Sequence, residues 1–126
     1  MGRMAIPLIS VVDDDQSVRE SLARLIRSVG YDVQVFASAE EFLGAGHRRP
    51  ADCLILDIRM PGMSGLELQQ ALPATDRETP VIFITAHGSD KDVRARALGA
   101  GAVDYLLKPL QEDEVLKAID TALSST

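Results

Sequence analysis

The sequence predicts an α/β fold in which one parallel sheet of five strands is covered by five helices, distributed over both faces. Two observations lead to this prediction. Short apolar segments rich in β-branched residues alternate strictly with segments whose apolar residues recur at helical spacing. Such alternation implies parallel strands joined by right-handed crossovers. The strand segments are also almost continuously apolar, as a sheet buried on both faces requires.

The first strand is expected at LISVVD (8–13), and residues 16–29 then change to a helical period that ends at Gly30. The apolar face of this helix is formed by Val18, Leu22, Leu25, Ile26 and Val29. The segment YDVQVF (31–36) alternates like a strand, and Ser38 with Glu41 then matches the capping box that opens a helix. The stretch GAGHRRP, which contains the expected loop residue His47, ends that helix.

The second half of the chain continues the alternation. Further strands are expected at DCLILD (52–57), PVIFIT (80–85) and AVDYLL (102–107). Helices are expected over about 64–72, over 90–98 with a cap between Ser89 and Asp92, and after Pro109 with Val115, Leu116, Ile119 and Leu123 on one stripe. The helix over 90–98 has only Val93 and Leu98 as large apolar residues, so we expect it to be weakly anchored.

Length and composition limit the classes of protein to consider. A chain of 126 residues fits one domain, so we expect a single domain over 1–126 with its core at about 8–123. No apolar run approaches the roughly 20 residues that span a bilayer, and no signal-peptide core is present, so we expect a cytoplasmic protein without a membrane role. The net charge of −6 argues against nucleic-acid binding by this domain. The single cysteine, Cys53, is expected to be a buried apolar residue.

Polar residues follow the carboxyl ends of the predicted strands. Ligands in open parallel sheets bind outside these ends. The residues expected to meet there are Asp13, Asp14, Asp57, Thr85 and Lys108. Three carboxylates, one hydroxyl and one ammonium therefore converge on one edge, although they are far apart in the chain.

Crowded carboxylates need a positive charge, because two like charges 4 Å apart repel by about 4 kcal/mol at an effective dielectric near 20. Mg²⁺ suits this site, since it binds one or two protein carboxylates and keeps waters and phosphate oxygens. A carboxylate can also act as a nucleophile toward phosphorus. Asp57 is the best candidate, because it stands alone at the tip of a central strand before a Pro-Gly loop. Asp15 is expected to cap the first helix, which is also the commoner role of an Asp-Asp pair considered alone.

Four separated motifs carry a resemblance to a known family: VVDDDQSVR, LILDIRMPGMSGLE, PVIFITAHG and GAVDYLLKPL. The chain resembles the receiver domains of two-component response regulators, most of all those of the FixJ/NarL-type transcription factors. The resemblance covers about Leu8 to Leu123. It implies the flavodoxin-like fold, with a five-stranded sheet of order 2-1-3-4-5, for which a chemotaxis receiver is a standard example.

The resemblance also implies roles for individual residues. Asp57 would be the phosphoacceptor, while Asp13, Asp14 and Asp57 would bind Mg²⁺ together with the backbone carbonyl of Arg59. Lys108 would contact the phosphoryl group.

A second set of implied roles concerns the switch and its tuning. Thr85 would move toward the phosphoryl group and Tyr105 would change rotamer with it. The Lys108–Pro109 peptide bond would be cis. Arg59 and His87 stand at variable positions of the family whose side chains tune hydrolysis.

The function implied is a signalling phosphoacceptor that catalyses its own phosphorylation and dephosphorylation and is otherwise not an enzyme. Its partner would be a sensor histidine kinase. Phosphorylation would change the surface formed by the fourth helix, the fifth strand and the fifth helix, and dimerisation around Arg94, Asp104 and Lys117 is a hypothesis. The output, transcription through a DNA-binding domain, would come from outside these residues. The chain is either a free-standing receiver or, as we favour, a segment cut at a domain boundary.

Three alternative functions would each require residues that can be checked in the sequence. A haloacid dehalogenase-type phosphatase also uses an aspartate nucleophile and Mg²⁺, but it requires a second acid two residues later, where this chain has Arg59. A receiver that has lost phosphorylation usually lacks an acid or the lysine, and here all are present. A nucleotide-binding protein would need a Gly-rich first turn, whereas this one is acidic.

Overall fold

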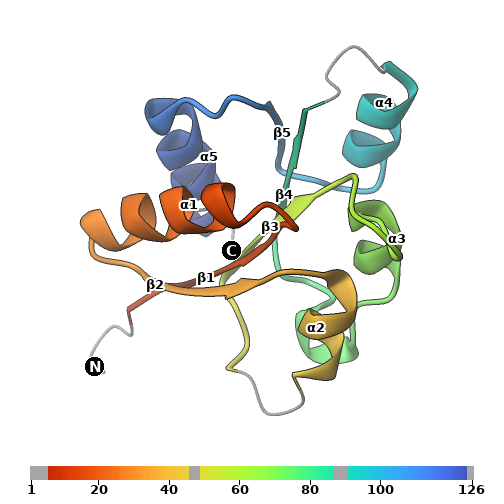
Figure 1. Cartoon of the computed structure of the whole chain (residues 1–126), viewed down its shortest axis with the longest axis horizontal. Coiled ribbons are helices and arrows are strands. Elements are labelled where there is room, and N and C mark those ends of the chain that lie inside the picture. Colours follow the sequence, from red (N-terminus) through yellow and green to blue (C-terminus); the bar gives the residue numbers. More distant parts are fainter. Residues whose placement is uncertain (1–5, 46–48, 87–90, 125–126) are drawn as a thin grey trace.

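The computed structural model describes residues 6–45, 49–86 and 91–124, and it has the predicted α/β architecture (Figure 1). Five parallel strands lie in the order β2-β1-β3-β4-β5. The strands are β1 (Leu8–Val12), β2 (Asp32–Phe36), β3 (Cys53–Asp57), β4 (Val81–Thr85) and β5 (Asp104–Leu107). The helices are α1 (Gln16–Ser28), α2 (Ala39–Gly44), α3 (Gly65–Gln70), α4 (Lys91–Gly99) and α5 (Glu112–Ser124), with a short 3₁₀ turn, η1 (Ala74–Asp76), that the sequence did not predict. The predicted strand order and the helices on both faces are confirmed.

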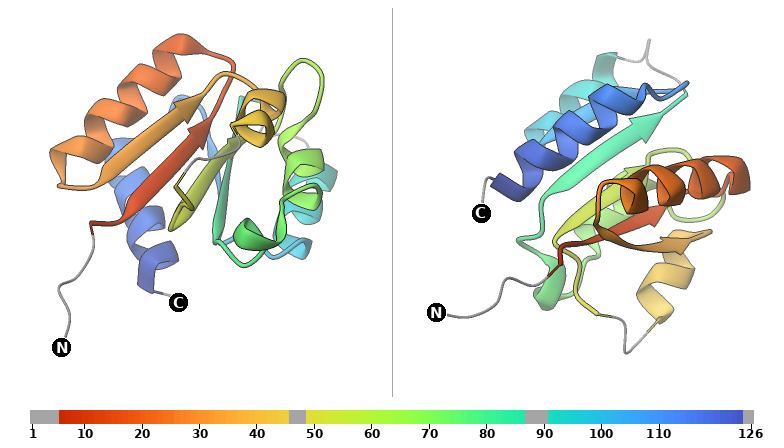
Figure 2. Two further views of the ribbon diagram at one scale, coloured as in Figure 1. Left: turned by 90° about the horizontal axis from the view of Figure 1, so that it is seen from below. Right: turned by 90° about the vertical axis from the view of Figure 1, so that its left-hand side faces the viewer.

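The helices form two layers, one on each face of the sheet (Figure 2). Helices α1 and α5 cover one face, where Ile26 and Ile119 pack with Ile55 of the central strand. Helices α2, α3 and α4 cover the other, where Phe42 and Leu68 are fully buried. Strands β1, β3 and β4 are buried along their whole length, which explains their almost continuously apolar sequences.

Two helices, α2 and α3, begin with a serine cap, and only α3 has the complete capping box. Ser38 caps α2 by accepting a hydrogen bond from the Glu41 N–H, at 3.0 Å. The Glu41 carboxylate accepts from the N–H of Ala37, at 3.3 Å, rather than from Ser38, so the predicted box is only half formed. At α3, Ser64 and Glu67 form both bonds, at 3.1 and 2.9 Å. This second box was not predicted, although the same S-x-x-E spacing is present there.

Several predicted boundaries and packing roles need correction. Helix α3 ends at Gln70, so Leu72 lies outside it, although its side chain is buried. Val29 ends α1 as its C-cap and is 44% exposed, so the apolar face stops one turn earlier. Leu98 is 40% exposed, and Ala97 is instead the buried residue of α4. The predicted loop residue His47 and residues 89–90 of the predicted cap between Ser89 and Asp92 lie outside the described residues, whereas Asp92 lies in the first turn of α4.

In the three described ranges, no helix combines the length and the apolar character needed to cross a membrane. Cys53 is fully buried, and burial raises the pKa of its thiol to about 12. The prediction that Cys53 is a buried apolar residue is therefore confirmed.

Candidate functional site

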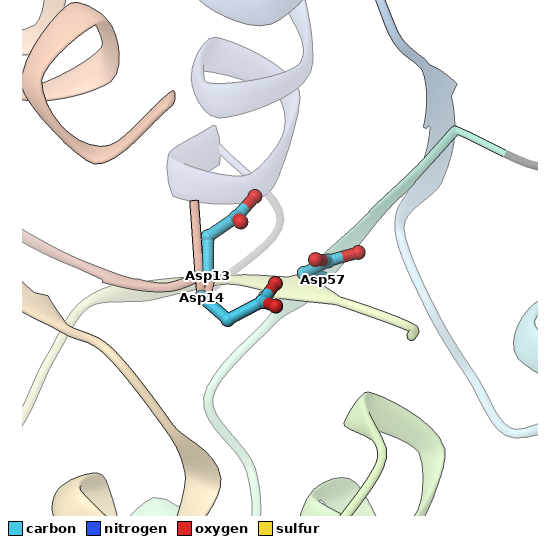
Figure 3. A group of neighbouring side chains, drawn as sticks. All are labelled: Asp13, Asp14 and Asp57. Atoms are coloured by element: carbon cyan, nitrogen blue, oxygen red, sulfur yellow. The ribbon is translucent and has the colours of Figure 1, made fainter. Parts of the chain in front are cut away.

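Three carboxylates meet where β1 and β3 end (Figure 3). The two strands are neighbours, with Val12 paired to Leu56, so the residues that follow the pair lie side by side. Each of Asp13, Asp14 and Asp57 places a carboxylate oxygen within 4.8 Å of the others. Asp13 and Asp57 are buried, at 0% and 3% exposed, whereas Asp14 is exposed. The predicted convergence of these acids at one sheet edge is therefore found.

Asp13 is held by its backbone and by its side chain, and its N–H donates to the Phe36 carbonyl at 3.1 Å. Its Oδ1 accepts a hydrogen bond from the Asp15 N–H at 2.8 Å, and its Oδ2 lies 3.0 Å from Nζ of Lys108. Its backbone carbonyl accepts from Nη1 of Arg19, in the first turns of α1, at 2.8 Å. These contacts fix the strand end on which the acidic pair depends. The sequence gives no direct sign of the Arg19 contact, because an arginine in a helix is ordinarily a solvated charge.

Asp15 belongs to the helix and not to the carboxylate cluster. Its Oδ1 accepts hydrogen bonds from the backbone N–H of Ser17 at 2.9 Å and from the Ser17 hydroxyl at 2.7 Å. These bonds to Ser17 hold the pKa of the Asp15 carboxyl below its usual value. Asp15 is therefore the N-cap of α1, as predicted.

Lys108 supplies the positive charge of the site. Its Nζ lies 3.0 Å from Asp13 Oδ2 and 3.5 Å from Asp57 Oδ2. Burial alone would lower the pKa of the ammonium, but the hydrogen bond to Asp13 and the charge of Asp57 outweigh it, so the pKa is raised. The Lys108 N–H donates to the Thr85 carbonyl at 2.8 Å, which ties the end of β5 to the end of β4. The Lys108–Pro109 peptide bond is cis, as predicted.

The carboxyl of Asp57 has a raised pKa. Burial and the negative charge of Asp13 raise the pKa of its carboxyl to about 7, while Lys108 opposes this rise. The single positive charge of Lys108 is thus outnumbered by the carboxylates of Asp13, Asp14 and Asp57, and those of Asp13 and Asp57 are buried. The donor set consists of hard oxygen atoms with excess negative charge, which fits a hard divalent cation such as Mg²⁺. Asp13, Asp14 and Asp57 could hold it.

The loop between β3 and α3 adjoins Asp57. The Arg59 N–H donates to Asp57 Oδ1 at 3.3 Å, and the Gly65 N–H donates to the Ile58 carbonyl at 2.9 Å. A Cβ atom at residue 65 would collide with the backbone carbonyl of Asp57. Gly65 therefore allows α3 to begin directly against the acceptor strand. Its signal in the sequence is a glycine straight after a capping serine, Ser64.

The two predicted switch residues lie on the neighbouring strands. Thr85 ends β4 and is 1% exposed, and β4 pairs with β3 so that Ile84 lies opposite Asp57. Tyr105, in β5, is 7% exposed and packs in the core on the α2–α4 face. The switching roles of both residues stay predictions, as do the role of Lys108 at a phosphoryl group and the tuning role of Arg59. His87 lies outside the described residues.

Comparisons with known proteins agree with this geometry. The family model described as "Response regulator receiver domain" matches residues 9–120. The chain is 47% identical over 116 residues to the response regulator protein TodT of Pseudomonas putida, a match that covers 92% of this chain and 51% of TodT. It thus spans about half the length of the curated relatives it matches.

Solved structures give the same result. The response regulator StyR is 50% identical with a TM-score of 0.82, and the match covers 95% of this chain and 60% of the StyR chain. The structure titled FixJ-N is 37% identical with a TM-score of 0.83, and the match covers 98% of each chain.

Proposed function

This chain belongs to the response regulator receiver domains, and from that premise we propose that Asp57 accepts a phosphoryl group from a partner sensor histidine kinase. The observation that carries the proposal is the placement of Asp57. Its buried carboxylate ends the central strand, within reach of two further carboxylates and 3.5 Å from an ammonium. A carboxylate with only a structural role would gain nothing from two neighbouring carboxylates, because each of them destabilises its ionised form.

In the proposed reaction, a phosphoryl group is transferred from a histidine nitrogen of the kinase to a carboxylate oxygen of Asp57. A carboxylate oxygen of Asp57 attacks the phosphorus of the phosphohistidine, the O–P bond forms as the P–N bond breaks, and the imidazole leaves with the electron pair and takes up a proton. Lys108 places a positive charge beside the equatorial phosphoryl oxygens, where negative charge must be stabilised. Attack by water on the acyl phosphate resets the site. The domain thus catalyses its own modification and is otherwise not an enzyme.

We propose that Asp13, Asp14 and Asp57 hold Mg²⁺, with the backbone carbonyl of Arg59 as a further ligand. Their all-oxygen donor set and excess negative charge support this assignment. When bound, the cation neutralises the phosphoryl oxygens during transfer. Arg59 and His87, which flank the site in sequence, are proposed to tune the lifetime of the acyl phosphate.

The proposed response is a shift between two packings of the sheet edge. Phosphorylation replaces the single negative charge of the Asp57 carboxylate with a phosphoryl group that carries a charge of about −1.5 to −2. Thr85 and Lys108 are therefore drawn toward it. The Lys108–Thr85 backbone hydrogen bond couples the two residues, and Tyr105 follows in the adjacent strand. The α4–β5–α5 surface then changes partners, because α4 is weakly anchored: only Ala97 is buried, and Val93 is partly buried against the core.

We propose transcription as the output, exerted by a segment outside these 126 residues. Relatives such as FixJ of Azorhizobium caulinodans are named transcriptional regulatory proteins, and the match covers 54% of that FixJ. The acidic domain itself would not bind DNA. The proposal places the domain in the cytoplasm with its kinase.

Phosphorylation is proposed to promote a homodimer through the α4–β5–α5 surface. Arg94, Asp104 and Lys117 line one groove there together with Tyr105, and Leu107 beside them is 48% exposed. Charges of both signs around apolar area suit an interface that pairs with its own copy. Sedimentation with and without a phosphoryl analogue tests this, and a monomer under both conditions contradicts it.

The test of phosphorylation is mass spectrometry after incubation with Mg²⁺ and a small acyl phosphate. We expect a gain of one phosphoryl group that is lost in Asp57→Asn and in excess chelator. Asp15→Asn is the matched control, because it removes a carboxylate two residues from Asp13 that serves only the helix cap. No gain in the wild type, or a gain that survives Asp57→Asn, refutes the proposal and favours a receiver fold that has lost phosphorylation.

A further inference from the structure

We propose that Glu40 is a positioning residue for the proposed site, because it anchors the loop that follows the acceptor strand. This acceptor loop comprises residues 58–64. Oε2 of Glu40, in the first turn of α2, accepts a hydrogen bond from the backbone N–H of Met63 at 3.0 Å. The two residues are 23 positions apart, so the bond joins separate elements of the fold.

The acceptor loop is fixed at its base without Glu40. The Gly65 N–H donates to the Ile58 carbonyl, which brings the two ends of the loop together. The capping box of Ser64 and Glu67 secures its last residue. The contact made by Glu40 is to Met63, within the loop and one residue before the capped Ser64, so it supplies a restraint in addition to those at the two ends.

Gly62, which precedes Met63, also lies against the Glu40 carboxylate. Gly62 has a backbone φ of +77°, which residues other than glycine rarely adopt. A Cβ atom at this position would lie 2.7 Å from Oε2 of Glu40, closer than real Cβ contacts. The absent side chain of Gly62 therefore leaves the space that the carboxylate occupies. Glu40 is seated against the loop, although much of its surface is exposed.

The position of the acceptor loop bears directly on Asp57. Arg59, near its start, donates its N–H to Asp57 Oδ1 at 3.3 Å. The Arg59 carbonyl is also the proposed fourth protein ligand of Mg²⁺, and in this respect the inference rests on the proposed function. A loop free to move at Met63 would hold the N–H and the carbonyl of Arg59 less firmly beside Asp57. Glu40 touches neither the cation nor the reacting atoms, so its role is indirect.

A simpler role for Glu40 would be to place negative charge at the amino end of α2. Glu41 offers the test, because it lies in the same turn and carries the same charge. Its carboxylate accepts from the Ala37 N–H and is not bonded to the acceptor loop. If Glu40 acted only through the helix, its removal would therefore resemble the removal of Glu41.

The experiment compares Glu40→Ala with Glu40→Gln and Glu41→Ala in the whole chain. The first readout is the exchange rate of the Met63 amide hydrogen by NMR without metal. We expect exchange about three- to tenfold faster in Glu40→Ala, as the loss of one hydrogen bond predicts, and nearly unchanged in Glu41→Ala. Glu40→Gln keeps an oxygen acceptor and should restore most of the protection.

The second readout is the Mg²⁺ dissociation constant by calorimetry, followed by the phosphorylation rate. We expect Glu40→Ala to bind Mg²⁺ about three- to tenfold more weakly than Glu41→Ala, and to be phosphorylated correspondingly more slowly. Equal Met63 exchange or equal Mg²⁺ affinity in the two alanine variants overturns the inference. Wild-type protein that takes up no phosphoryl group refutes the proposed function instead, while the Met63 comparison still decides whether Glu40 anchors the loop.

Discussion

Lys108 lies nearer to Asp13 than to Asp57, the proposed phosphoacceptor: its Nζ is 3.0 Å from Asp13 Oδ2 and 3.5 Å from Asp57 Oδ2. Asp13 has no exposed surface, so its carboxylate contacts this ammonium and the Asp15 N–H in place of bulk water. Without a cation, one ammonium therefore compensates two buried carboxylates.

Replacing Lys108 with methionine should have opposite effects on stability and on cation binding. In chelator, we expect Lys108→Met to lower the free energy of unfolding by about 2–4 kcal/mol, because two buried carboxylates lose their partner. We also expect tighter Mg²⁺ binding, since a competing positive charge has gone. Urea unfolding and calorimetry measure the two effects. Lys117→Met, an exposed lysine of α5, is the control, and weaker Mg²⁺ binding by Lys108→Met would contradict the prediction.

The raised pKa of Asp57 predicts a pH-dependent stability in metal-free protein. An unfolded aspartate loses its proton near pH 3.8, whereas the folded Asp57 keeps it to about 7. The folded state thus binds more protons in this window, so the contribution of Asp57 to the free energy of unfolding falls as the pH rises from about 4 to 7.

Comparison with Asp57→Asn isolates this contribution, because asparagine keeps the shape without the charge. We expect the variant to exceed the wild type in stability by up to about 4 kcal/mol at pH 8, and by much less at pH 4, since each tenfold change in proton affinity is worth about 1.4 kcal/mol and the pKa rises from 3.8 to about 7. Urea unfolding in chelator at several pH values measures the difference. A difference that is constant with pH would mean that Asp57 titrates normally.

Gly65 should tolerate no side chain. We expect Gly65→Ala to lower the free energy of unfolding by about 1–3 kcal/mol, because its Cβ would collide with the Asp57 carbonyl and must displace α3 or the end of β3. Gly99→Ala is the matched control, since no atom lies within 4 Å of a Cβ there. Thermal unfolding compares the two, and equal effects would show that the contact with Asp57 relaxes without cost.

Helix α4 should open more easily than α5. Of the residues in α4 only Ala97 is buried, whereas α5 buries Val115, Ala118, Ile119 and Ala122. We therefore expect amide hydrogens of α4 to exchange at least tenfold faster than those in the middle of α5, as native-state exchange by NMR would measure. Similar protection in the two helices would contradict the proposal that α4 moves readily on phosphorylation.

The fold could be predicted because its signals are local. The apolar strand β3 and the helical period of α1 each appear within a few consecutive residues, and their alternation restricts the topology to very few choices. The convergence of Asp13 and Asp57 followed from that topology, because the ends of parallel strands meet at one edge. The N-cap role of Asp15 was likewise a matter of local spacing.

What could not be predicted depends on contacts between distant segments. The bond between Glu40 and Met63 depends on how α2 lies against the loop after β3, and no residue pattern encodes that approach. The exposed position of Val29 arose because α1 ends one residue before the apolar spacing does. That Lys108 lies between Asp13 and Asp57, and nearer to Asp13, follows only from the distances of its Nζ to the two carboxylates.

The acidic pair Asp13 and Asp14 and the ammonium of Lys108 come from opposite ends of the described chain, with Asp57 between them in sequence. Asp13 follows the first strand and Lys108 follows the last, and both must be in place before their charges can balance. A chain still emerging from the ribosome, or one cleaved before β5, would hold the acids without their counter-charge. In the proposed function, competence to accept a phosphoryl group would therefore arise only after the last strand has joined the sheet.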